Sequence, residues 1–215
     1  MTRLAVFDCD GTLVDGQAHV CDTMEQAFAD AGLSLPDRNE VRRSMGLSLP
    51  VAIRRLAPEI DPDLNAQLVA GYKEAFFARR QHGTIHEPLY DGIREVLIAL
   101  READWQLAVA TGKSDRGLQA CLEQHGLTDM FVSLQTADRH PSKPHTDMLD
   151  AAISEAGVAP QDAVMIGDTT FDIIMAKDAN VRSIGVAWGY HAPEELLEAG
   201  AEAVARDALH LGKIV

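Results

Sequence analysis

Short apolar runs recur at wide intervals along the chain, and they constrain the fold more than any other feature. Each run is too short for a helix and lacks the alternation of a half-exposed strand, as is typical of parallel strands covered on both faces. Helical patterns separate the later runs. This order predicts an α/β protein with an open, doubly wound, mainly parallel sheet. The predicted strands are Leu4–Phe7, Leu107–Ala110, Ala163–Ile166 and Ile184–Ala187, with a weaker candidate at Phe131–Leu134.

The helical patterns fall into two groups. Those that alternate with the strands are Gly92–Ala103, Asp115–His125, Thr146–Ala156 and Phe171–Ala179. The others lie between residues 17 and 84, where no strand pattern occurs: His19–Ala31, Asn39–Met45, Leu49–Leu56 and Pro62–Arg80. A helical block of about 65 residues is too long for an ordinary crossover between strands. We therefore predict a core made of residues 1–16 and 85–215, and a helical cap of residues 17–84 inserted after the first strand.

Charge and cysteine content exclude several classes of protein. Asp plus Glu number 33 and Lys plus Arg 19, for a net charge of −14. Such acidity argues against a nucleic acid or an anionic membrane surface as partner. The 3 cysteines include no CxxC pair, which indicates a reducing cytoplasm with no disulfide framework and no zinc site. We expect a cytoplasmic protein with a small-molecule substrate, and the oligomeric state stays open.

Polar residues of informative types follow the predicted strands. Asp8 and Asp10 come directly after the first strand, two residues apart, and in extended backbone they project to the same side. Thr111 and Asp168 follow two later strands, and Lys143 lies in a loop from which it could reach them. Ligands of open α/β sheets bind beyond the carboxyl ends of the strands. The sequence therefore predicts that these side chains meet at one edge of the sheet.

The residue types in this set favour one chemistry. Carboxylates with open positions suit Mg²⁺, which prefers one or two protein carboxylates together with waters and a phosphate oxygen. A threonine hydroxyl, turn N–H groups and a lysine suit a phosphoryl group. Phosphoryl transfer needs mainly positioning and charge neutralisation, and this set can supply both.

The order of these motifs resembles that of a known family. Asp8-Cys9-Asp10-Gly11-Thr12 matches the DxDGT signature of the haloacid dehalogenase-like (HAD) hydrolase superfamily. Thr111, Lys143 and the segment from Gly167 to Asp172 (GDTTFD) are similar to its second, third and fourth motifs. The inserted helices resemble the cap of the subgroup that includes phosphoglycolate phosphatases, β-phosphoglucomutases and pyrophosphatases. One departure is Thr146, which stands where that subgroup often has the second proline of Lys-Pro-x-Pro.

The resemblance implies a role for each residue on a Rossmann-like core. Asp8 would attack phosphorus and become an aspartyl phosphate. Asp10 would protonate the leaving oxygen and then deprotonate the attacking water. Mg²⁺ would be held by Asp8, by the backbone carbonyl of Asp10 and by Asp168, with Asp172 orienting a metal-bound water. The groups implied to hold the phosphate are Thr111, the Gly112 N–H and Lys143.

Substrate choice is expected to reside in the cap. Arg42 or Arg43 could meet an anionic group of the substrate, and Gly46 would let the cap backbone approach it. We therefore predict an Mg²⁺-dependent phosphatase acting on a small phosphorylated metabolite, with 2-phosphoglycolate as the first candidate. A sugar-phosphate mutase, a pyrophosphatase and a non-enzymatic regulatory module remain alternatives. A dehalogenase is disfavoured, because a halide leaving group needs no acid at Asp10.

Overall fold

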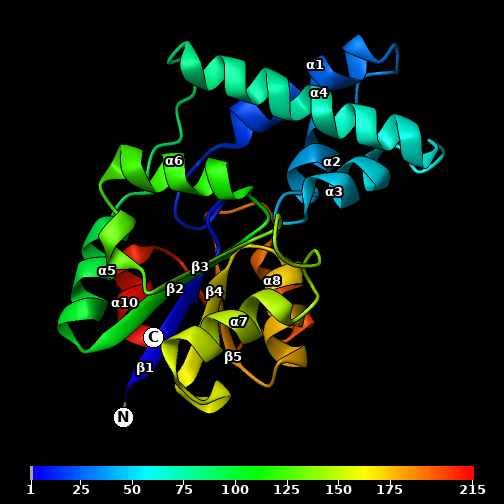
Figure 1. Ribbon diagram of the computed structural model, residues 1–215. Helices are drawn as coiled ribbons and strands as arrows, with labels where there is room; N and C mark the ends of the chain where they lie inside the picture. Colours follow the sequence, from blue (N-terminus) through cyan, green and yellow to red (C-terminus); the bar gives the residue numbers. More distant parts are fainter. Residues whose placement is uncertain (1) are drawn as a thin grey trace.

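A six-stranded parallel sheet forms the centre of the molecule. The computed structural model describes residues 2–215, and its sheet has the strand order β3-β2-β1-β4-β5-β6 with every neighbouring pair parallel. The predicted doubly wound α/β class is therefore confirmed (Figure 1). The strands are β1 (Arg3–Phe7), β2 (Trp105–Thr111), β3 (Ser133–Thr136), β4 (Ala163–Gly167), β5 (Arg182–Val186) and β6 (Ala203–Ala205).

Helices cover both faces of this sheet, which explains why the strands read as continuous apolar runs. In β1, Ala5 and Phe7 join the core on one face, whereas Leu4 and Val6 join the core on the other. The first face packs against α5 (Ile93–Glu102), α6 (Asp115–His125) and α10 (Ala208–Ile214), and the second against α7 (Asp147–Ala156) and α8 (Thr170–Asp178). Helix α9 (Pro193–Ala199) packs on α8 and β5.

Four elements differ from the sequence prediction. Strand β3 begins at Ser133, because a short 3₁₀ turn, Thr128–Met130, occupies the chain just before it. Strand β6 was not predicted, since its three residues carry too short an apolar signal. The two helices α9 and α10, which flank β6, were not predicted either.

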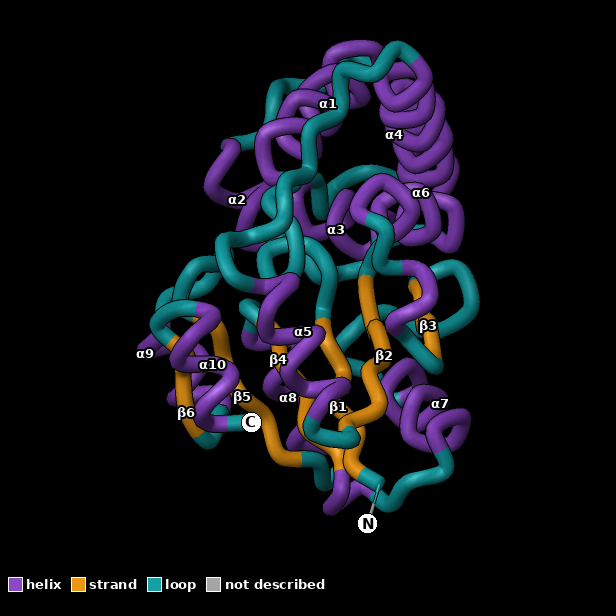
Figure 2. The backbone as a smooth tube through the Cα atoms, turned by 90° about the vertical axis from the view of Figure 1, so that its left-hand side faces the viewer, coloured by secondary structure: helices purple, strands orange, loops and turns teal. Residues whose placement is uncertain are grey.

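Four helices occupy the stretch between β1 and α5. They are α1 (Gln17–Asp30), α2 (Arg38–Arg43), α3 (Leu49–Leu56) and α4 (Pro62–Gln81), and they lie together beyond the carboxyl ends of the strands (Figure 2). We call residues 17–84 the helical insert. It has an apolar core of its own, which includes Met24, Phe28, Val41 and Ile53. The two segments that connect the insert to the core lie side by side, joined by a hydrogen bond in which Asp15 N donates to Pro88 O at 2.9 Å.

Candidate active site

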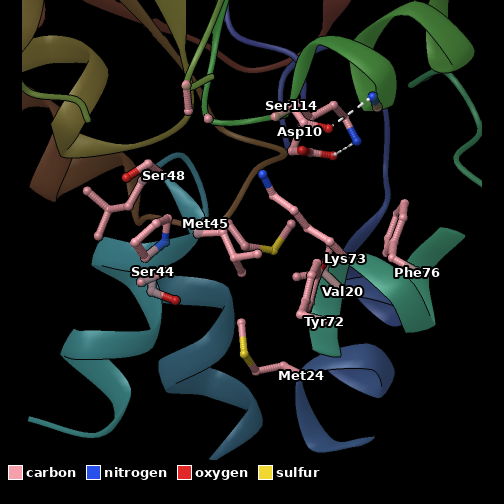
Figure 3. A pocket seen from close by; sticks show the side chains of 18 of the residues that line it. Asp10, Val20, Met24, Ser44, Met45, Ser48, Tyr72, Lys73, Phe76 and Ser114 are labelled. Atoms are coloured by element: carbon pink, nitrogen blue, oxygen red, sulfur yellow. Dashed lines mark hydrogen bonds and ion pairs between the residues drawn. The ribbon is translucent and has the colours of Figure 1, made fainter. Parts of the chain in front are cut away.

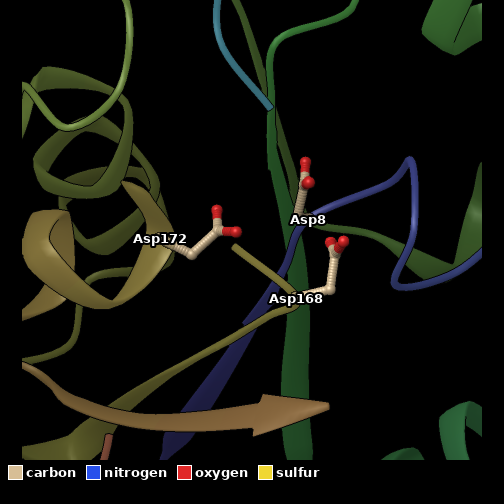
Figure 4. A group of neighbouring side chains, drawn as sticks. All are labelled: Asp8, Asp168 and Asp172. Atoms are coloured by element: carbon tan, nitrogen blue, oxygen red, sulfur yellow. The ribbon is translucent and has the colours of Figure 1, made fainter. Parts of the chain in front are cut away.

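Three carboxylates from two strand ends and one helix converge beyond the sheet. Phe7 of β1 pairs with Val109 of β2 and with Ile166 of β4. Because this register aligns the strand ends, the segments that follow leave the sheet side by side. Asp8, Asp168 and Asp172 each place one carboxylate oxygen within 4.8 Å of the others, and all three are buried (Figure 4).

Asp168 is fixed by two hydrogen bonds. Thr12 Oγ1 donates to Asp168 Oδ1 at 3.0 Å, and Tyr190 N donates to Asp168 Oδ2 at 2.9 Å. Gly11 is packed so closely against this carboxylate that a Cβ would overlap it, and its φ of +85° also favours glycine. Burial and the neighbouring charge of Asp8 raise the pKa of Asp168 well above its ordinary value. The site therefore holds a costly charge that a cation would relieve.

Asp172 is a capping residue as well as a member of the cluster. Its Oδ2 accepts hydrogen bonds from Thr169 N at 3.1 Å and from Thr169 Oγ1 at 2.7 Å, as a capping box at the start of α8. Its Oδ1 accepts from Lys143 Nζ at 2.6 Å. Both carboxylate oxygens are therefore engaged by the protein, so Asp172 anchors Lys143 and the start of α8.

Lys143 is buried and lies between two carboxylates. Its Nζ is 2.9 Å from Asp8 Oδ1, in addition to the contact with Asp172. Burial alone would lower the pKa of Lys143, but the charges of Asp172 and Asp8 outweigh it and raise the pKa. The lysine thus stays charged where it can neutralise a group on Asp8. The sequence prediction placed Lys143 beside Asp8, and the structure brings the two together.

The Asp8 carboxylate is held without hydrogen bonds. Among residues 2–215, none donates to either of its oxygens, although Lys143 Nζ lies close to Oδ1. Burial raises the pKa of Asp8 to about 7, with Lys143 opposing this shift and Asp172 adding to it. Orphaned carboxylate oxygens in a cluster of acids are the donors that hard divalent cations prefer. The cluster therefore fits a divalent cation.

The residues predicted to bind phosphate, Thr111 and Gly112, lie at the end of β2. Thr111 is buried and accepts a hydrogen bond from Lys113 N at 3.2 Å. Gly112 faces the helical insert, and a Cβ there would lie 2.5 Å from Leu47 O and 2.8 Å from Gly46 O. Only glycine lets the two segments approach so closely. Gly112 and Gly46 thus mark the seam between core and insert, and both line the pocket described below.

Asp10 is held by a chain of ion pairs that sequence reasoning missed. Lys113 Nζ lies 2.9 Å from Asp10 Oδ1 and 2.7 Å from Glu87 Oε1. The other oxygen of Glu87 pairs with Arg80 at the end of α4. Burial raises the pKa of Asp10, with Lys113 opposing the shift. Burial alone would raise the pKa of Glu87 as well, but the ion pairs with Lys113 and Arg80 outweigh it and hold the pKa below its usual value.

One signal in the sequence could have revealed part of this series of ion pairs. Lys113 directly follows the Thr111-Gly112 motif, so it had to lie near the residues predicted to bind phosphate. Glu87 had no comparable signal, because it lies in the hinge segment and its burial depends on packing between distant parts of the chain. Its side chain is fully buried.

The structure does not bring the two predicted cap arginines into the site. Arg43 pairs with Glu195 of α9, with Arg43 Nη2 2.6 Å from Glu195 Oε1. Arg42 Nε donates to Gln17 Oε1 at 2.7 Å, and neither arginine lines the pocket. Gly46 does line it. A substrate-binding role for Arg42 or Arg43 thus stays a prediction, with no contact in the site to support it.

Together the fold and the acid cluster define a class of protein: a doubly wound parallel α/β protein with buried acidic residues at the carboxyl ends of neighbouring strands. Residues 5–186 match the haloacid dehalogenase-like hydrolase family. The chain belongs to this family, as its four motifs predicted, and its relatives place it with the phosphoric monoester hydrolases.

Similar proteins cover nearly the whole chain. A protein of Dickeya dadantii (strain 3937) named probable phosphatase IndB is 35% identical over 201 residues, which span 91% of this chain and 86% of that protein. A phosphoglycolate phosphatase of Vibrio vulnificus (strain YJ016) is 30% identical and spans 99% of this chain and 96% of its own length. The crystal structure of a predicted phosphatase from Clostridium acetobutylicum superposes with a TM-score of 0.88 at 26% identity, covering 98% of this chain and 96% of that one.

No helix among residues 2–215 combines the length and apolar character needed to cross a bilayer.

Proposed function

We propose that this protein is an Mg²⁺-dependent phosphatase that hydrolyses a small phosphorylated metabolite through an aspartyl phosphate on Asp8. One observation carries the proposal: a buried carboxylate without hydrogen bonds faces a buried lysine 2.9 Å away, inside a cluster of two further acids. A carboxylate nucleophile splits one difficult displacement into two easier ones. Lys143 reduces the repulsion between Asp8 and an approaching phosphate dianion.

The two chemical steps use Asp8 and Asp10 in different roles. In the first, an Asp8 oxygen forms a bond to phosphorus while the bond to the leaving oxygen breaks, and Asp10 gives that oxygen its proton. In the second, Asp10 takes a proton from a water whose oxygen attacks the same phosphorus, and the bond to Asp8 breaks. Free phosphate and unmodified Asp8 result. A raised pKa at Asp10 favours the protonated form that the first step needs.

Asp8, Asp168 and the backbone carbonyl of Asp10 are the groups we assign to Mg²⁺. When bound there, the ion would supply positive charge beside the transferring phosphoryl group. Asp172 supports this arrangement from the start of α8, through Lys143.

Lys113 and Glu87 act on the reaction through Asp10. The ion pair at 2.9 Å fixes one oxygen of Asp10, so the other is left to face the leaving group. Glu87 holds the lysine in turn at 2.7 Å. We assign both as positioning residues.

We also infer that the insert, residues 17–84, is a cap and that residues 1–16 and 85–215 form the catalytic core. The contacts that cross the seam support this division, among them Ser48 N to Ser142 Oγ at 2.8 Å. A cap in this position excludes water from the site during transfer. The name of the Vibrio relative makes 2-phosphoglycolate the reference substrate for testing.

Turnover of p-nitrophenyl phosphate tests the proposal. The purified protein is assayed with Mg²⁺ and after EDTA treatment, with Mg²⁺ restored as the control. We expect phosphate release that EDTA abolishes and Mg²⁺ recovers. Equal rates with and without EDTA would contradict the proposal. Isomer formation from a sugar phosphate, without phosphate release, would favour a mutase.

A further inference from the structure

A pocket extends from the catalytic core into the helical insert. It has a volume of about 420 Å³. Asp10 lies at its core end and Met24 at its far end, between the helices of the insert (Figure 3). Because Asp10 is the group we assign to protonate the leaving oxygen, the alcohol part of the substrate would occupy this pocket.

Carbon atoms dominate the lining of this pocket. Val20 and Met24 come from α1, Met45 from the loop after α2, and Tyr72 and Phe76 from α4. Figure 3 shows most of these side chains gathered around one space, between Asp10 and Met24. Aromatic and thioether side chains at a binding surface favour planar or irregular apolar groups.

The positive charges of the lining are mostly paired. Lys73 Nζ lies 3.3 Å from Asp138 Oδ1 at the exposed edge of the pocket. Lys113 contacts Asp10 and Glu87, and Arg80 contacts Glu87. A second anionic group on the substrate would have to displace one of these carboxylates or reach an unpaired cation at the solvent side of the pocket. Near Asp10, the lining therefore favours a leaving group that carries no second charge.

Arg116 is the one cation of this lining that lacks a carboxylate partner among residues 2–215. Its guanidinium carbon lies 3.3 Å from the ring centroid of Phe77, and the residue is exposed. It is thus held against an aromatic face at the solvent side of the pocket. This placement makes Arg116 the residue to test if the substrate does carry a second anion.

The volume of the pocket also favours a leaving group larger than glycolate. Pockets of about 300–1,000 Å³ enclose ligands of drug-like size. Glycolate, the alcohol released from 2-phosphoglycolate, has only two carbons and would leave most of a 420 Å³ pocket unfilled. A ring with a short linker to the phosphate would instead contact both α1 and α4.

We propose that the pocket binds an apolar, ring-bearing leaving group, so that the preferred substrates are phosphate esters of alcohols that carry a planar ring and no second anionic group. This inference rests on the proposed phosphatase function and narrows its substrate class. The ring lies against Tyr72 and Phe76, and the ester oxygen faces Asp10.

The test compares three esters at saturating Mg²⁺: ethyl phosphate, 2-phenylethyl phosphate and 2-phosphoglycolate. The first two release primary alcohols of similar acidity, so a difference between them reports binding in the pocket and not leaving-group chemistry. We expect kcat/KM for 2-phenylethyl phosphate to exceed that for ethyl phosphate by about 10- to 100-fold, the usual effect of burying a phenyl group. It is also expected to exceed that for 2-phosphoglycolate.

Two variants test whether residues of the pocket cause the preference for 2-phenylethyl phosphate. Phe76→Ala is expected to lower the ratio between 2-phenylethyl and ethyl phosphate by about tenfold, since it removes a ring contact. Leu35→Ala is the matched control, because Leu35 lies in the insert, outside the pocket, and is 60% exposed. It is expected to leave the ratio as in the wild type.

Two results would overturn the inference while leaving the phosphatase function intact. One is an equal kcat/KM for the ethyl and 2-phenylethyl esters. The other is a preference for 2-phosphoglycolate that Arg116→Gln abolishes, which would assign that arginine to a second anion. No turnover of any ester, p-nitrophenyl phosphate included, would instead overturn the proposed function, and the inference with it.

Discussion

The core and the helical insert differ in how their geometry arises, and the proposed function assigns them different parts. In the core, Asp8 and Asp168 each directly follow a strand end, so strand register alone brings these two acids together. In the insert, the pocket is formed by side chains of α1, α4 and a loop, whose relative placement depends on packing. The comparison indicates that local motifs place the groups proposed for catalysis, whereas tertiary contacts shape the pocket proposed to select the substrate.

The largest expected effect comes from a change in the core that tests the proposed nucleophile. Asp8→Asn removes the nucleophile, and we expect kcat for p-nitrophenyl phosphate to fall on the order of 10⁴-fold or more. The loss of a buried negative charge beside two other acids should not lower the melting temperature. Initial rates and thermal unfolding of the same preparation check both points. A variant that is folded and retains appreciable activity would refute the assignment of Asp8.

The next effect tests the connection between core and insert. Lys113→Met frees the Asp10 carboxylate and leaves Glu87 with only Arg80 as partner. We expect kcat to fall by about 10- to 100-fold with KM little changed, because a general acid loses its orientation while substrate contacts persist. Lys113→Arg, which keeps the charge, should recover part of the rate.

A change in KM alone, or an equal loss in the arginine variant, would contradict the positioning role. Glu87→Gln provides a second test, because it removes the group that holds Lys113 without touching Asp10. We expect the kcat of the Glu87→Gln variant to fall as well.

Removal of the metal should make the stability of the core depend on pH. In the metal-free protein, burial raises the pKa of Asp8 from 3.8 to about 7. A raised pKa gives a contribution to stability that is complete below pH 3.8 and is lost as the pH rises through about 7. In EDTA, this group should therefore make the protein less stable at pH 8 than at pH 5, and Mg²⁺ should reduce the difference.

Thermal unfolding at several pH values, with EDTA and with Mg²⁺, measures this dependence. Asp8→Asn is the matched control, because it removes one of the acids with a raised pKa and should make the metal-free stability depend less steeply on pH. A wild-type profile that Mg²⁺ leaves unchanged would argue against a cation at the acid cluster.

The smallest expected effect concerns the seam. Arg43 and a backbone N–H hold the pKa of Glu195 down at about 2, from 4.5. The pair therefore stabilises the contact above pH 4.5, and its contribution is lost as the pH falls toward 2. Because the pair is partly exposed, Glu195→Gln should cost only about 0.2–1 kcal/mol of unfolding free energy at pH 7.

Urea unfolding at pH 7 measures this cost. A loss of several kcal/mol would mean that the pair contributes to the fold much more than its exposure suggests. A large fall in activity at full stability would instead assign Arg43 a role in the site.

The sequence predicts the core well because its signals are local. The apolar runs predicted five of the strands, and the acids that directly follow two of them, Asp8 and Asp168, predicted the centre of the acid cluster. Glu87 and the ion pairs of Lys113 escaped prediction, because they depend on contacts between the hinge, α4 and the end of β2. The ion pair of Arg43 escaped prediction for the same reason. Its partner, Glu195, lies in a helix that the sequence pattern did not predict.

The central claim, a phosphoryl group carried by Asp8, can be tested directly in an Asp10→Asn variant with p-nitrophenyl phosphate. This ester has a good leaving group and needs little help from an acid, whereas hydrolysis of the intermediate still lacks its base. After acid quench and peptide mass spectrometry, we predict one added phosphoryl group on the peptide that contains Asp8. Slow turnover with no phosphorylated peptide, or with the phosphoryl group on another residue, would contradict the account.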